Sequence, residues 1–198
     1  MLKEREYERR RALEYARRWA YGRNPLFYNF TGIGGDCTNF ISQCLLAGCC
    51  VMNCTPTFGW YYRSSSDRAP AWTGVEYFYN FITRSQPNAG PFGLSTELEQ
   101  LEPGDFVQLR FDKDVFGHTP VVVSIGSPAT LDNTLIAAHS YDADWRPLST
   151  YEFQEIRFLH ILGAYRETGG EEAPPPRPER PPRWNWLRPP FWFGQQRE

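Results

Sequence analysis

Cys37 is the residue whose setting points most clearly to chemistry. It lies in GGDCTNFISQCLLAG, residues 34–48, where apolar residues recur from Cys37 onward at the spacing of one helix face. The helix is therefore expected to begin at or near Cys37 and to end at Gly48. Unpaired N–H groups and the macrodipole at a helix start favour an anion, so the position favours a reactive thiolate. A buried structural cysteine is the alternative interpretation of the same pattern.

Two histidines follow that could serve such a cysteine. His118 opens a valine-rich run, and His139 ends the next apolar run. Antiparallel pairing about a turn near residue 129 or 130 brings them close together on one face, whereas a one-residue slip puts them on opposite faces. In the favourable register, one imidazole takes the thiol proton and the other orients it. Two separate structural histidines are the alternative.

Other polar residues in this region allow different assignments. Asp142 and Asp144 follow His139 closely and could orient the base instead, or could simply be turn residues. His160 lies inside the apolar run RFLHILGAY and is expected to be a core histidine.

The remaining cysteines do not form a recognisable metal or disulfide pattern. Their total with Cys37 is five, and no CxxC pair occurs among them. We expect neither a zinc site nor a second catalytic set from these residues, which are Cys44, Cys49, Cys50 and Cys54. No metal and no cofactor are expected.

The elements that must position these residues fall into two blocks. Helical periodicity predicts a helix over residues 3–20 and another that starts near a capping box formed by Thr73 and Glu76. From residue 101 the pattern changes to strands, in LEPGDFVQLRF, GHTPVVVSIG and TLIAAHS. Helices followed by consecutive antiparallel strands indicate an α+β domain.

The composition limits the classes of partner. The 198 residues carry a formal net charge of −2, divided into +4 over residues 1–24, −9 over the middle and +3 over residues 173–198. An acidic body argues against nucleic acid as the main partner. The N-terminus is charged where a signal peptide would be apolar, so a cytoplasmic location is expected.

The last part of the chain differs from the rest. Proline is dense from residue 169 onward, which predicts a domain over residues 1–168 and a separate Pro-, Arg- and Trp-rich tail over residues 169–198. Interleaved Trp, Phe and Arg in this tail suggest a weak contact with an anionic membrane or with the cell envelope.

Several of these stretches together resemble the bacterial putative amidase domain family. They are RRALEYARRWAYGRNPLFYNFTGIGGDCTNFISQCLLAG, GWYYRSSSDRAPAWTGVEYFYNFI, LEPGDFVQLR, GHTPVVVSIG and HSYDADWRPLS, and the resemblance runs from about residue 7 to 166 in the family's order. The family is similar to the NlpC-type and CHAP-type papain-like cysteine hydrolases. The resemblance therefore implies a papain-like fold, with the nucleophilic cysteine at a helix N-terminus packed on an antiparallel sheet.

The resemblance also implies roles for individual residues. Cys37 matches the nucleophile, His118 the general base and His139 the polar third position. Pro120 stands where the family usually has a small residue, and Cys49 follows Gly48 where the family usually has a second glycine. Neither change removes a catalytic group.

An aromatic block lies between the helices and is expected to contribute to substrate binding. It contains Trp60, Tyr61 and Trp72, which could line the cleft or belong to the core.

The sequence therefore predicts a cysteine amidohydrolase that cleaves an amide or peptide bond through an acyl-enzyme. Cell-wall-type peptides are one candidate substrate. A non-catalytic peptide- or wall-binding module and acyl transfer to an amine are the alternatives.

Overall fold

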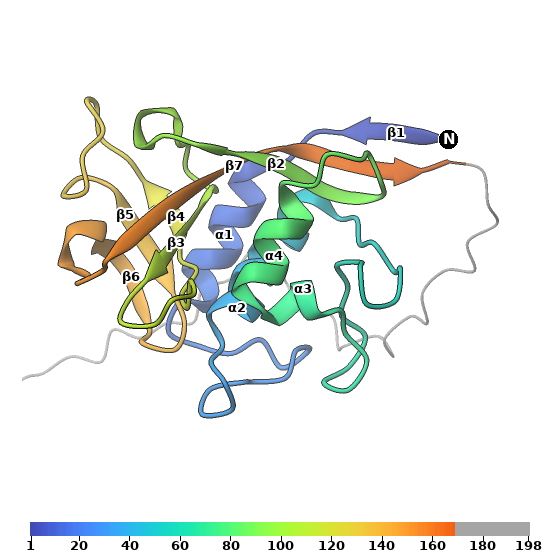
Figure 1. The fold of residues 1–198 in the computed structure, drawn as a ribbon, viewed down its shortest axis with the longest axis horizontal. Coiled ribbons are helices and arrows are strands. Elements are labelled where there is room, and N and C mark those ends of the chain that lie inside the picture. The colour runs from blue at the N-terminus through green and yellow to red at the C-terminus, as the bar shows by residue number, and fades with distance from the viewer. Residues whose placement is uncertain (169–198) are drawn as a thin grey trace, which may run out of the picture. The chain divides into compact units, whose positions relative to one another are not determined.

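The computed structural model describes residues 1–168, which combine an antiparallel curled sheet with four helices (Figure 1). The helices are α1 (Arg9–Trp19), α2 (Cys37–Cys49), α3 (Pro70–Thr73) and α4 (Val75–Ile82). The strands are β1 (Leu2–Arg5), β2 (Gly90–Thr96), β3 (Phe106–Arg110), β4 (Val121–Ser124), β5 (Leu135–Ala138), β6 (Ala143–Pro147) and β7 (Glu155–Glu167). Two short 3₁₀ helices are η1 (Leu98–Gln100) and η2 (Leu148–Thr150).

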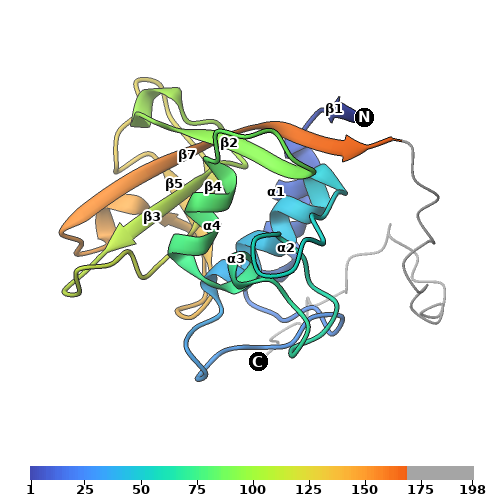
Figure 2. The same cartoon turned by 45° about the vertical axis from the view of Figure 1, so that its right-hand side comes forward.

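Strand β7 joins the two parts of the sheet. The strand order is β1-β7-β3-β4-β5-β6, and β2 also pairs with β7. Residues 155–159 of β7 pair with β3, residues 164–167 pair with β1, and residues 158–165 pair with β2. Figure 2 shows β7 as a long bent strand that passes beside the helices, with β3 to β5 towards one end and β1 at the other. Every strand pair is antiparallel, as the sequence predicted.

The two faces of β4 and β5 belong to different hydrophobic clusters. Val121 and Ala137 join the cluster that packs against the helices. Val122 and Ile136, which alternate with them, join a second cluster on the other face. This period-two alternation decides on which side of the sheet each neighbouring polar residue lies.

Helix α2 is buried almost throughout its length. Eleven of its 13 residues are buried, and it packs against both α1 and α3. It starts at Cys37 and extends one residue past Gly48, so the sequence-based bounds are close. Cys50 ends it in the left-handed conformation and donates its N–H to the Leu46 carbonyl.

Two expectations for the helices were wrong in detail. The helix predicted over residues 3–20 begins only at Arg9, because residues Leu2–Arg5 pair with the end of β7 instead. The helix predicted from the capping box begins at Val75 with Gly74 at its N-cap. Thr73 ends the preceding helix α3 and does not cap α4.

The described residues thus have a mixed α and β architecture with an antiparallel sheet. None of the helices in residues 1–168 has the length and apolar character needed to cross a bilayer. The tail over residues 169–198, with its predicted surface contact, lies outside the described residues.

Candidate active site

Cys37 is the first residue of α2. Gly34 and Gly35 precede it with φ values of +86° and +102°, which a residue with a Cβ adopts only with strain, and they turn the chain into the helix. The first helical hydrogen bond runs from the Phe40 N–H to the Asp36 carbonyl at 3.0 Å. The Asp36 side chain does not cap the helix, so the first N–H groups of α2 remain without a side-chain cap.

The Cys37 thiol is buried, with 7% of the residue exposed. Its Sγ lies 3.8 Å from Thr38 Oγ1 and against the backbone N–H groups of Thr119 and Thr38. Burial raises the pKa of the thiol, these donors lower it, and the net pKa lies above the ordinary value. The helix start alone favoured a thiolate, but burial outweighs it, so the resting cysteine is a neutral thiol.

The residue that follows His118 contacts that thiol. Thr119, which follows His118 directly, directs its N–H to Cys37 Sγ, and Thr119 Oγ1 lies 3.4 Å from Thr38 Oγ1. The His118 backbone is fixed by its carbonyl, which accepts the Leu109 N–H at 3.0 Å. The structure therefore brings the segment that carries His118 to the start of α2.

The His118 side chain is buried, and its hydrogen-bonding capacity is not fully used. Only 5% of the residue is exposed, and Nε2 has no hydrogen-bond partner among residues 1–168. Burial lowers the pKa of the imidazole to about 4, and the Arg146 cation contributes to the shift. At neutral pH His118 is therefore an uncharged imidazole that can accept a proton.

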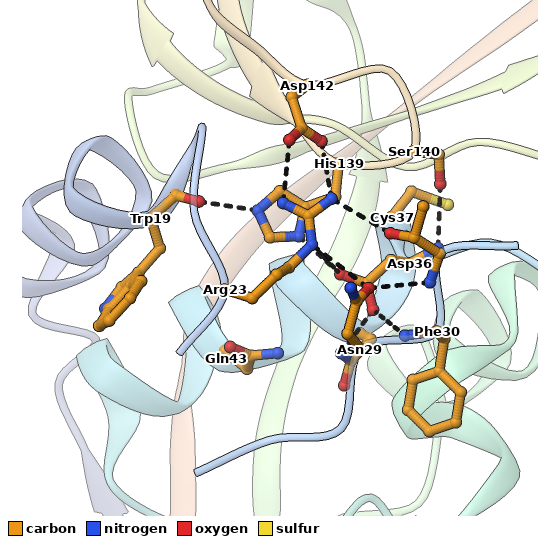
Figure 3. Close-up of polar contacts among 12 residues, drawn as sticks. Trp19, Arg23, Asn29, Phe30, Asp36, Cys37, Gln43, His139, Ser140 and Asp142 are labelled. Atoms are coloured by element: carbon orange, nitrogen blue, oxygen red, sulfur yellow. Dashed lines mark hydrogen bonds and ion pairs between the residues drawn. The ribbon is translucent and has the colours of Figure 1, made fainter. Parts of the chain in front are cut away.

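His139 has a very different environment. Its Nδ1 lies 2.7 Å from Asp36 Oδ2, and its Nε2 lies 2.8 Å from the Trp19 carbonyl oxygen (Figure 3). Its ring stacks on Phe40 with a centroid distance of 3.8 Å. Both partners are hydrogen-bond acceptors, so each ring nitrogen lies where it can donate a hydrogen bond.

Asp36 is the centre of this polar cluster. Its Oδ1 accepts from the Phe30 N–H at 2.9 Å and from Asn39 Nδ2 at 2.8 Å, and its Oδ2 lies 3.3 Å from Arg23 Nε. Burial raises the pKa of this carboxyl. Its hydrogen bonds, of which the one from His139 has the largest effect, lower the pKa by more than burial raises it, so the pKa lies below its ordinary value. The carboxylate therefore stays ionised and holds His139 in place.

The structure does not pair His139 with His118. Val121 lies opposite Ala137, so continuing this register puts residue 118 opposite 140 and not 139. His139 consequently shares the helix-facing side with Ala137, and His118 packs on the other side with Phe111 and Tyr151. This is the one-residue slip that separates the two imidazoles.

The Asp142 carboxylate is bound by an arginine. Arg23 binds it in a bidentate manner, with Nη1 to Oδ2 at 3.0 Å and Nη2 to Oδ1 at 2.8 Å. Arg23 thereby joins Asp142 to Asp36, which fixes the segment after β5 against the start of α2 (Figure 3).

The three aromatic residues expected at the substrate cleft lie in or near the core. Trp60 and Trp72 have no exposed surface, and their rings lie 4.8 Å apart. Their indole N–H groups donate to Ser42 Oγ at 3.1 Å and Asn39 Oδ1 at 2.9 Å. Tyr61 is 8% exposed. The two tryptophans support α2 from within and present no surface to a ligand.

The other cysteines and His160 have separate surroundings. Cys44 and Cys49 are buried, Cys50 and Cys54 are exposed, and all are free. Within residues 1–168 no cluster of three or more His, Cys, Asp or Glu side chains could hold a metal ion. His160 is half-buried, and its Nδ1 lies 2.7 Å from Asp105 Oδ2.

Two residues of the site could not be assigned from the sequence. Asp36 precedes Cys37 directly, and its position in GGDC was the available signal. Tyr151 lies in PLSTYEF, outside any periodic pattern, and only the fold brings its ring to 5.5 Å from that of His118.

A family model described as a putative amidase domain matches residues 6–162. A relative from Bacillus subtilis (strain 168), named uncharacterized protein YhbB, is 33% identical over 166 residues, which cover 79% of this chain and 51% of the relative. The chain thus spans about half the length of this relative. No solved structure matches the chain.

Proposed function

The chain belongs to the putative amidase domain family, and on that premise we propose that it is a cysteine amidohydrolase of papain-like type, with Cys37 as nucleophile and His118 as general base. One observation carries the proposal. A cysteine at an uncapped helix start lies against the backbone of the residue next to a buried, uncharged histidine with an unpaired nitrogen.

The reaction begins from a neutral pair. His118 removes the thiol proton as Cys37 Sγ bonds to the amide carbon, and the carbonyl electron pair moves onto oxygen. N–H groups at the start of α2 stabilise the resulting oxyanion. When the C–N bond breaks, the proton held by His118 passes to the leaving amine. Water, deprotonated by His118, then attacks the thioester and releases the acid and the free thiol.

Asp36 and His139 contribute to this site indirectly. Because the Asp36 carboxylate bonds to His139 and not to the helix start, it leaves the N–H groups of α2 available for the oxyanion. His139 is thus a positioning residue that holds Asp36 away from the N-cap role.

The substrate proposed is an amide or peptide, with cell-wall-type peptides as one class to be tested. Wild type, Cys37→Ala and Cys44→Ala should be incubated with muropeptides and with ordinary peptides, and the products identified by mass spectrometry. Cys44 is a matched control because it is a buried cysteine on the same helix. Turnover lost in Cys37→Ala and retained in Cys44→Ala supports the proposal.

The raised pKa of Cys37 and its burial favour one alternative, a peptide-binding module without turnover. Such a module would bind a peptide from the same panel equally well with Cys37→Ala and would yield no product. Addition of an amine nucleophile to the assay separates hydrolysis from acyl transfer, because transfer yields a new amide.

A further inference from the structure

Tyr151 lies directly beside His118 on the face of the sheet away from the helices. It follows η2, and its ring lies 5.5 Å from the His118 ring with an angle of 41° between the planes. The Arg146 guanidinium lies 3.8 Å from the Tyr151 ring centroid. Two hydrogen bonds to Thr150, from Nε to Oγ1 at 2.7 Å and from Nη2 to the carbonyl at 2.9 Å, fix Arg146. The phenol ring thus lies beside both the His118 ring and the Arg146 guanidinium.

The Tyr151 hydroxyl is buried and makes no hydrogen bond of good geometry among residues 1–168, and the nearby Arg146 side chain interacts with it only enough to lower its pKa. A buried polar atom without a partner costs free energy, so each case needs an explanation. Nε2 of His118, on the neighbouring ring, is in the same condition. The two atoms do not bond to each other, and both are therefore available to a third group.

The hydroxyl also lies within the electrostatic range of Cys37. Burial raises the pKa of Tyr151, and the charge that Cys37 would carry as a thiolate raises it further. The phenol therefore keeps its proton at neutral pH and can act only as a donor toward an anion. The Arg146 cation opposes that shift and adds positive potential at the same place.

We propose that Tyr151 is a further catalytic residue of the Cys37–His118 site, whose hydroxyl donates a hydrogen bond to the carbonyl oxygen of the substrate amide as that oxygen becomes an oxyanion. The inference rests on the proposed function. The phenol keeps its proton throughout, so no group is transferred. This bond satisfies the hydroxyl only when the substrate is bound, which accounts for its lack of a partner in the free protein.

Tyr151→Phe tests this inference because it removes only the oxygen and keeps the ring between His118 and Arg146. The turnover number should fall by about ten- to a thousandfold, as for other single oxyanion donors, with little change in KM. Thermal stability should not fall, because the lost hydroxyl had no partner. Tyr7→Phe is the matched control: its hydroxyl donates to the Gly104 carbonyl at 2.8 Å, so stability should fall and turnover should not.

A second readout does not require a known substrate. The Cys37 thiol adds its S–H across the C=O bond of N-acetylglycinal and forms a hemithioacetal. The hemithioacetal oxygen takes the place of the substrate's carbonyl oxygen. Binding should be lost in Cys37→Ala and weakened at least tenfold in Tyr151→Phe. Equal aldehyde affinity in wild type and Tyr151→Phe, with loss in Cys37→Ala, would overturn the role of Tyr151 and leave the nucleophile intact. Wild type that binds no better than Cys37→Ala would overturn both.

Discussion

His118 and His139 are both buried near the start of α2, but their surroundings are opposite. His139 has an acceptor for each ring nitrogen and an aromatic ring stacked on its face. Among residues 1–168 nothing pairs with Nε2 of His118, and burial lowers the pKa of its ring to about 4. A buried histidine with a partner for each nitrogen stabilises a fold, whereas an uncharged histidine with a free nitrogen costs stability and can accept a proton. This difference supports the proposal that His139 has a structural role and His118 a chemical one.

The strongest test of this contrast is removal of the chemistry. His118→Gln should lower turnover by about a hundred- to ten-thousandfold, because it removes the general base. The free energy of unfolding should not fall in parallel, since the wild-type ring is incompletely bonded. Steady-state kinetics and chemical denaturation of the same preparation would check both. A His118→Gln protein that keeps full turnover contradicts the assignment.

His139→Ala should have its largest effect on stability. The substitution removes the closest hydrogen-bond partner of the buried Asp36 carboxylate and opens a cavity against Phe40, so the free energy of unfolding should fall by about 3–5 kcal/mol. His160→Ala is the control: Asp105 keeps Arg9 at 2.7 Å, and the loss should be smaller. Urea denaturation measures both. Equal losses in the two variants would show that the Asp36–His139 contact contributes no more to stability than the Asp105–His160 contact.

Much of this organisation follows from local sequence patterns. The start of α2 at Cys37, the antiparallel strands after residue 101 and the buried apolar face of α2 were visible as periodicity, whereas the burial of its polar residues was not. The pairing of Leu2–Arg5 with β7 was not, because it depends on a partner more than 150 residues away and overrides a helical pattern.

The site was harder to predict than the fold. The position of His139 depends on a single residue of register, which neither strand's composition fixes. The sequence pattern put Cys37 both at a helix start, which favours a thiolate, and on an apolar helix face, which opposes it, and it could not decide which effect is larger. Tyr151 comes to the site through η2, with no periodic signal at all.

The lowered pKa of His118 also predicts an effect of pH on stability. The unfolded chain binds a proton at this histidine below about pH 6.5, whereas the folded protein does so only near pH 4, so the unfolded state is favoured as pH falls through this window. The contribution lost is on the order of 3 kcal/mol. Denaturation between pH 7 and pH 4 should show a smaller loss in His118→Gln. An identical pH dependence in both proteins would show that His118 titrates normally.

The smallest expected effect concerns reactivity toward simple alkylating reagents. Cys37 is buried with a raised pKa, whereas Cys50 and Cys54 are exposed. Iodoacetamide at about pH 6 should therefore modify Cys50 and Cys54 before Cys37, by a few-fold or more. Peptide mapping gives the order. Preferential modification of Cys37 would indicate a thiolate–imidazolium pair and would reverse the resting charge state described above.

The most direct test of the central claim is the pH dependence of Cys37 acylation by p-nitrophenyl acetate, with the acetyl group located by peptide mapping. If uncharged His118 is the base, acetylation occurs at Cys37, and its rate is constant down to about pH 5 and falls to half near pH 4, where His118 gains its proton. His118→Gln should abolish this plateau, and Cys44→Ala should retain it. Acetylation confined to Cys50 and Cys54, or a Cys37 rate that rises tenfold per pH unit up to pH 8 as for a free thiol, would contradict the account.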